Sequence, residues 1–220
     1  MAVIHRTTVE PSMLELLTSW LPSRPWYRSG TSGPELAGAG GFRLDDPRGE
    51  VGIEFMVIVD TSGAAPVPYL VPLTYRGAPL DGADGALVGT AQHGVLGQRW
   101  VYDGCHDPVL VTQLLALIGG RAEAQAQSVS DTPDTEITRS CAGAPVPAGS
   151  ATTVTDHQGG TDLVMTSGAS LRVRRELWAD PDGAPPLPEG TIGHAGGPWN
   201  MPDGTRPRGL FAVLHTEPPA

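Results

Sequence analysis

The chain has 220 residues, of which 40% are hydrophobic and 17% charged, a composition that predicts a globular protein with a buried core. Its formal net charge of −10 excludes partners that select clustered positive charge, so we expect no contact with nucleic acid or an anionic membrane. All 14 basic residues are arginine, which excludes mechanisms that need a lysine ammonium group.

No leader or membrane segment is visible in the sequence. Residues 1–11 contain no apolar run after a basic segment, and no apolar stretch is long enough to span a bilayer. We therefore expect a soluble cytoplasmic protein.

The first predicted element is a short helix that begins near Pro11 and ends at Pro22. Apolar residues recur through it at helical spacing, which predicts one buried stripe that includes Trp20. Residues 29–41 are rich in Gly, Ser and Ala, and we predict a loop there, with Gly38–Gly41 as a connector. Trp26 follows the helix, and we expect both tryptophans to be structural.

Alternating apolar residues then predict strands over 51–59 and 67–75, with two more strands at 86–92 and 96–102. Together with the helix, these elements predict an α+β fold in which one helix packs on a curved antiparallel sheet. The unit extends over residues 1–120.

A second helix is predicted over residues 109–118, where nearly every residue is apolar. Such a helix must be covered on two sides, by the sheet and by either the second half of the chain or a partner. Leu114, Leu115 and Leu117 are therefore candidates for a partner face, and a protein partner or homo-oligomer is expected.

The composition changes after the second helix. Residues 121–149 have few large apolar residues and predict a linker or long loop. Residues 150–220 predict a small β-rich segment, with strands at 152–156, 162–165, 171–178 and 210–215. Residues 181–207 are expected to form a Gly/Pro-rich excursion.

Three separated motifs in the first half resemble the N-terminal cap of actinobacterial maltokinases. They are Trp20-Leu21-Pro22-Ser23-Arg24-Pro25-Trp26-Tyr27, then Tyr69-Leu70-Val71-Pro72-Leu73, and then Asp103-Gly104 with Asp107-Pro108. The resemblance implies that residues 1–120 form a cystatin-like cap, a curved antiparallel sheet around one helix. It also implies a setting in α-glucan, trehalose or maltose metabolism.

The kinase chemistry of that family does not transfer. Residues 171–175 carry arginine where an ATP-binding lysine would be sought, and His93-Gly94 is followed by Val95 rather than by a catalytic Asp. We therefore predict a non-catalytic cap-like protein that acts through protein association. A saccharide-binding module, or an accessory part of a sugar kinase or glucan-modifying enzyme, is the alternative.

We assign structural roles to most of the other candidate residues, and we expect no catalytic residue, cofactor or metal. Cys105-His106-Asp107 contains the side chains of a hydrolase triad, but adjacent side chains diverge, so a buried Cys105 and a helix-capping Asp107 are expected. Neither the histidines nor the cysteines show zinc-ligand spacing. Trp199 lies in a Gly/Pro-rich loop and is the candidate contact for a saccharide or a protein.

Overall fold

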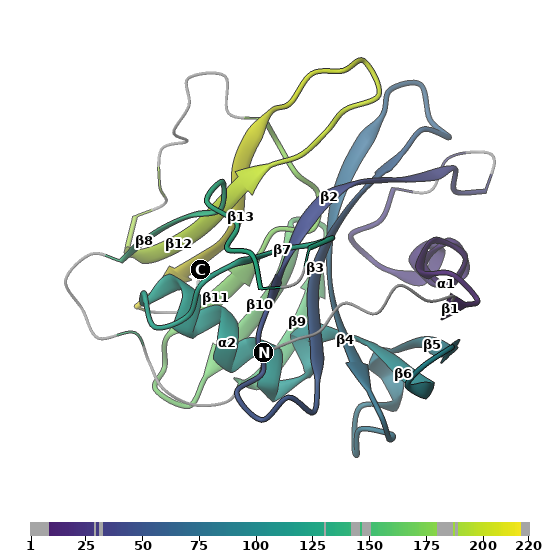
Figure 1. Ribbon diagram of the computed structural model, residues 1–220. Helices are drawn as coiled ribbons and strands as arrows, with labels where there is room; N and C mark the ends of the chain where they lie inside the picture. Colours follow the sequence, from purple (N-terminus) through teal and green to yellow (C-terminus); the bar gives the residue numbers. More distant parts are fainter. Residues whose placement is uncertain are drawn as a thin grey trace.

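The computed structural model describes residues 9–28, 30, 33–129, 131–141, 146, 151–179, 187 and 189–216. Two antiparallel sheets, here called sheet A and sheet B, pack face to face (Figure 1). One helix lies at one end of the space between them, and another helix covers the opposite face of sheet A (Figure 1). The α+β prediction of a curved antiparallel sheet with one packed helix, followed by a helix and a second small β-rich segment, is confirmed, and the β-rich segment contributes to sheet B.

Sheet A contains the predicted strands of the first half. In spatial order it comprises β1 (Val9–Glu10), β5 (Leu87–His93), β6 (Gly97–Asp103), β4 (Val67–Arg76), β3 (Gly52–Asp60), β2 (Leu36–Leu44) and β7 (Gln125–Ala126). Alternate residues of β3 point to opposite faces, so Phe55 and Val57 join the core between the sheets, while Ile58 joins the cluster beneath the first helix. Both faces of the central strands are therefore covered.

Helix α1 (Met13–Trp20) lies on the outer face of sheet A and continues into the short 3₁₀ helix η1 (Leu21–Ser23). Ser12 caps α1 by accepting a hydrogen bond from the Glu15 backbone N–H, and the Glu15 carboxylate accepts one from the Ser12 N–H in return. The Trp20 and Trp26 rings are buried against one another and against the sheet, as expected for structural residues.

Sheet B comprises, in spatial order, β8 (Thr138–Cys141), β12 (Thr191–Pro198), β13 (Arg208–His215), β11 (Ser170–Val173), β10 (Gly160–Met165) and β9 (Ala151–His157). The strands β9, β10 and β13 lie where the sequence predicted them, whereas the strand predicted over residues 171–178 ends at Val173. Two further 3₁₀ turns, η2 (Asp84–Ala86) and η3 (Gly104–His106), lie at the ends of β5 and β6. The predicted linker, residues 121–149, also contributes to the sheets, because it supplies the edge strands β7 and β8.

The loop predicted for residues 29–41 is wrong over its second half, because Gly38–Gly41 belong to β2. The β2 register shifts between Gly38 and Gly40, and Gly41 has a φ of 136°. A Cβ on Gly41 would lie 2.1 Å from the Phe55 carbonyl oxygen. Glycine permits the positive φ and the close approach, so this segment forms a strand without apolar alternation.

We expect Gly41→Ala to destabilise the protein by about 1–3 kcal/mol from backbone strain alone, before the clash with β3 is added. Gly38→Ala is the matched control, because a Cβ there would meet no atom within 4 Å. Urea unfolding of both variants and the wild type measures the difference. If the two variants proved equally stable, this description of the β2 backbone would be wrong.

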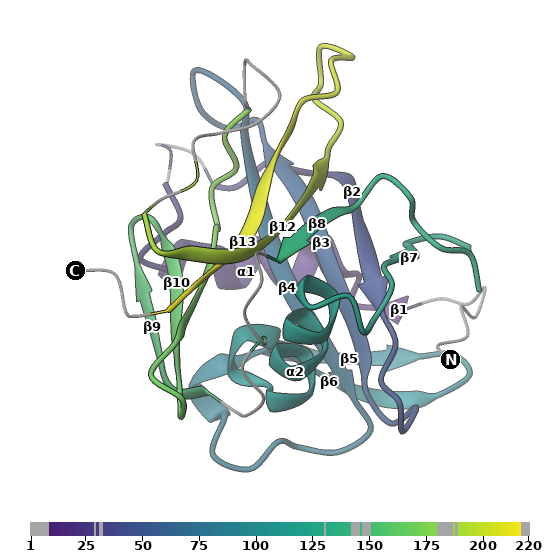
Figure 2. The same ribbon diagram turned by 90° about the vertical axis from the view of Figure 1, so that its left-hand side faces the viewer.

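Helix α2 (Pro108–Ile118) buries the three leucines of the predicted partner face inside the protein, and this corrects that prediction. Leu114, Leu115 and Leu117 are exposed by 1%, 2% and 2%. The helix packs against β2 on one side and against β8 and β12 on the other (Figure 2). The second half of this chain therefore covers the face that the sequence left open to a partner, and no partner can contact these leucines in the folded chain.

The chain crosses from sheet B to sheet A just after β11. The Leu70 N–H donates to the Arg175 carbonyl, and the Leu177 N–H donates to the Pro68 carbonyl, so this segment pairs with the start of β4. The Arg175 side chain is fully buried, and its Nη2 lies 2.7 Å and 2.6 Å from the two carboxylate oxygens of Asp103. Main-chain pairing and a buried ion pair thus join the two sheets.

Candidate functional site

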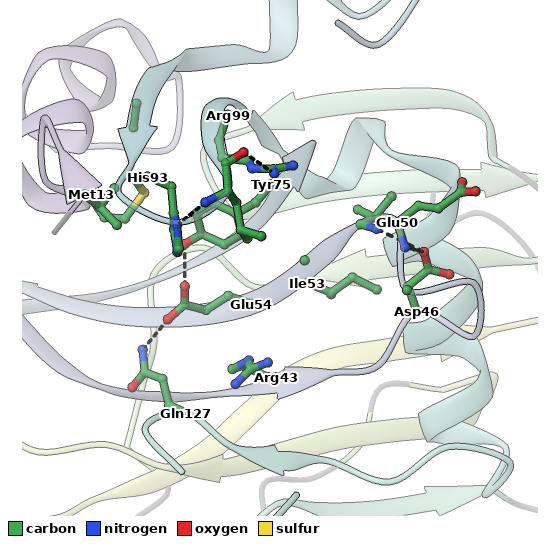
Figure 3. Close-up of a pocket in the computed structure, with 16 residues that line it drawn as sticks. Met13, Arg43, Asp46, Glu50, Ile53, Glu54, Tyr75, His93, Arg99 and Gln127 are labelled. Atoms are coloured by element: carbon green, nitrogen blue, oxygen red, sulfur yellow. Dashed lines mark hydrogen bonds between the residues drawn. The ribbon is translucent and has the colours of Figure 1, made fainter. Parts of the chain in front are cut away.

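A cavity of about 520 Å³ lies on the face of sheet A that carries α1, next to the start of that helix. Its floor is formed by the sheet, with Arg43 from β2, Glu54 from β3 and Tyr75 from β4 (Figure 3). The curved sheet brings the β5–β6 hairpin to one side, where Leu96 and Arg99 complete the wall. Met13 at the start of α1 adds an apolar side chain. The result is a concave surface with a polar floor and a partly apolar rim, and its volume is in the range of small-molecule sites.

A hydrogen-bond network centred on Glu54 organises the floor. The Tyr75 hydroxyl donates to Oε2 of Glu54, and Nε2 of Gln127 donates to Oε1 over 2.7 Å (Figure 3). The pKa of the Tyr75 hydroxyl stands well above its ordinary value, first because of burial and then because the Glu54 carboxylate adjoins it. Tyr75 therefore remains a protonated donor, and both oxygens of Glu54 have a donor.

The two arginines of the cavity have fewer hydrogen-bond partners than Glu54. Arg43 is half-buried, and its guanidinium makes no hydrogen bond or ion pair with any described residue. On the hairpin side, Nη2 of Arg99 donates to the Leu96 carbonyl over 2.5 Å, while its buried Nε has no hydrogen-bond partner among the described residues. The hairpin itself is held by Nδ1 of His93, which accepts from the Val95 and Leu96 N–H groups.

Asp46 lies at the other end of the cavity and serves the β2–β3 loop. Its carboxylate accepts hydrogen bonds from the backbone N–H groups of Arg48, Glu50 and Val51. Burial alone would raise the pKa of Asp46, but these donors together lower it below the ordinary value. The group is therefore an ionised structural carboxylate and cannot act as a general acid near neutral pH.

Trp199 does not occupy the exposed position that its sequence context predicted. It is 1% exposed and packs against Phe211, because the preceding glycines belong to β12 and carry the ring into the core between the sheets. This prediction of a ligand or partner contact is therefore wrong. The exposed tryptophan is Trp178, at 60%, with the Arg28 guanidinium 5.6 Å from its ring centre.

Cys105, His106 and Asp107 have the structural roles expected from the sequence. Cys105 is 1% exposed, and burial raises the pKa of its thiol well above the ordinary value. Asp107 caps α2 by accepting from the Val109 N–H, and it also binds Arg76 through both carboxylate oxygens. His106 is exposed, so the three side chains diverge. Among the described residues, no cluster of three or more His, Cys, Asp or Glu side chains could hold a metal.

Residues 20–107 match the family model of the maltokinase N-terminal cap domain. The chain therefore contains a segment that is similar to a maltokinase cap, here called the cap-like domain. The matched range begins at the end of α1, includes β2–β6 and ends at the cap residue of α2. A search of curated proteins gave no match to the chain. Over the described residues, no helix is long and apolar enough to cross a membrane.

The cap-like domain supplies most of the cavity described above, including Arg43, Glu54, Tyr75 and Arg99. Gln127 and Met13 come from outside the matched range. Sequence reasoning missed this site because its residues come from separate strands. Arg43 and Glu54 are direct cross-strand neighbours, and each places a charge on a sheet face that is otherwise apolar nearby, which is the signal that could have found them.

Proposed function

We propose that this cap-like protein is non-catalytic and acts through association with another protein in actinobacterial α-glucan, trehalose or maltose metabolism in the cytoplasm. The family match to a maltokinase cap supports the metabolic setting. The partner in this proposal is an enzyme of that metabolism, such as a sugar kinase.

The ion pairs formed by two arginines after β10 support a non-catalytic role. Arg175 is buried against Asp103, and Arg172 forms a two-pronged ion pair with Asp162 at 2.7 Å, so neither offers a cation to a nucleotide phosphate. The sequence contains no lysine that could replace them. Phosphoryl transfer depends on a positioned cation at the phosphates, and two of the three arginines in residues 171–175 are held in structural ion pairs.

The observation that carries the association is the exposed pair of Trp178 and Arg28. The indole is 60% exposed and the Arg28 side chain 63%, and Nε of Arg28 also lies 2.8 Å from the Glu176 carboxylate. Tryptophan and arginine are the residue types that most often dominate the binding energy of protein interfaces. The pair also joins the cap-like domain, which contains Arg28, to the second half of the chain.

Placing a photo-crosslinking amino acid at position 178 in native cells is expected to capture one main partner. The same probe at Asp203, an exposed turn residue outside the pair, is the matched control and should not capture it. The captured protein is then purified and titrated against the wild type and Trp178→Ala by calorimetry. We expect the variant to remain folded and to bind at least about tenfold more weakly, since hot-spot truncations exceed about 2 kcal/mol.

Equal binding by Trp178→Ala and the wild type would contradict this interface. Capture at Asp203 but not at position 178 would contradict it as well. Phosphate transfer from Mg-ATP to maltose by the purified chain would overturn the non-catalytic part of the proposal.

A further inference from the structure

We propose that the cavity on sheet A binds a small organic anion, with the Arg43 guanidinium holding its phosphate or carboxylate group. This inference is independent of the association proposed above, because neither Trp178 nor Arg28 lines the cavity. It rests on a comparison between the polar groups of the cavity that already have hydrogen-bond partners within the chain and those that have none.

The floor and loop carboxylates of the cavity are engaged internally. Glu54 accepts from Tyr75 and Gln127, one donor at each oxygen, and Asp46 accepts from three backbone N–H groups of its own loop. Glu50, the third acid, lies on the exposed rim and points away from the floor (Figure 3). The acids that face the floor therefore do not call for a cationic ligand.

Arg43, unlike these carboxylates, has no hydrogen bond or ion pair with a described residue. Its cross-strand neighbours are Glu54 on β3 and Gln125 on β7, yet Glu54 bonds to Tyr75 and Gln127 instead of to the guanidinium. Arg43 lines the cavity and lies on the floor beside Glu54 (Figure 3). A half-buried guanidinium offers five donors in a planar fork that matches a phosphate or carboxylate. The Arg43 nitrogens are open to solvent, so an anion in the concave site replaces water as their acceptor and forms charge-assisted hydrogen bonds.

Arg99 adds a second positive charge on the hairpin side of Tyr75 (Figure 3). Its bond to the Leu96 carbonyl fixes the guanidinium in place, and its buried Nε has no partner among the described residues. Met13, Val9 and Leu96 provide apolar contact nearby, so the site accommodates a molecule with a small body attached to its anionic group. Inorganic phosphate and the carboxylate of gluconate are suitable probes, because they separate the two sources of the same chemistry.

The test is calorimetric titration of the full chain with inorganic phosphate and, separately, with gluconate at constant ionic strength. We expect saturable binding of at least one anion, weakened about tenfold or more by Arg43→Gln and less by Arg99→Gln. Arg48→Gln is the matched control. It removes the same charge from the adjacent β2–β3 loop, but Arg48 is exposed and does not line the cavity, so its binding should equal that of the wild type.

A second measurement needs no variant. Phenylglyoxal modifies accessible arginines, and mass spectrometry of the wild type should show that the bound anion protects Arg43 while Arg48 reacts at an unchanged rate. The proposal is overturned if neither anion binds saturably, if Arg43→Gln binds as tightly as the wild type, or if the anion protects Arg48 and Arg43 equally. Selective binding of phosphate would assign the site to phosphate esters, and selective binding of gluconate would assign it to organic acids.

Discussion

Asp103→Asn is expected to lower the free energy of unfolding by about 3–5 kcal/mol, because it leaves the buried Arg175 guanidinium without its counter-charge. Both groups are nearly inaccessible, with side-chain exposures of 0% for Arg175 and 1% for Asp103. The guanidinium also donates to the Thr161 hydroxyl and lies 4.8 Å from the centre of the Trp26 ring. It has no room to move to water, so the loss of the carboxylate charge is not relieved.

The matched control is Asp162→Asn, which breaks another Asp–Arg pair of similar geometry. Asp162 and Arg172 are 18% and 34% exposed, so solvent screens their attraction and the expected loss is below about 1 kcal/mol. Equilibrium urea unfolding of both variants measures the difference. Similar losses for the two variants would show that burial does not set the strength of the Asp103–Arg175 pair.

The pair also explains why the two halves of the chain form one body. Asp103 ends β6 in the cap-like domain, and Arg175 follows β11 in sheet B. A single core cluster contains residues of both sheets, among them Phe42, Phe55 and Phe211, whose rings are stacked. The cap-like domain therefore buries one face of its sheet against the second half of this chain.

Regular spacing of apolar residues was sufficient to predict the elements that have one face in a hydrophobic core and the other face in solvent or in a second hydrophobic cluster. The α1 stripe and the strands β3 and β4 follow this rule, and the structure has them where the sequence placed them. The strands β2 and β12 could not be found this way, because glycines occupy the positions that pack most closely. A Cβ on Gly196 would lie 2.4 Å from a carbonyl oxygen of β13, and one on Gly193 would lie 2.6 Å from Ile118.

The cavity and the position of Trp199 could not be predicted from the sequence, because glycine-containing strands were again mistaken for loops. A Gly/Pro-rich context suggested an exposed loop for Trp199, although the same glycines build β12 and bury the ring. The anion-binding candidate Arg43 lies within a segment that has no alternating pattern on its N-terminal side. Its neighbour Glu54 is 11 positions away in sequence, and only the register of β2 against β3 brings the two together. The two charges are visible in the sequence, but the sequence does not give the strand register that pairs them.

Leu114→Glu, Leu115→Glu and Leu117→Glu are each expected to unfold the monomer rather than to dissociate an oligomer. The three side chains are at most 2% exposed, and each charge would enter the core between the sheets, where desolvation costs several kcal/mol. A loss above about 4 kcal/mol approaches the whole stability of a typical domain, so these variants should lose their cooperative unfolding transition at room temperature.

Thr112→Glu is the matched control on the same helix. Thr112 is exposed, so a charge there remains in water, and the stability should change by less than about 1 kcal/mol. Circular dichroism melting and light scattering of all four variants separate unfolding from dissociation. A folded monomer of any of the leucine variants, released from a wild-type oligomer, would show that α2 reaches a partner after all. Because β8 and β12 cover the helix on the side away from β2, we expect no such species, and the search for a partner belongs at Trp178.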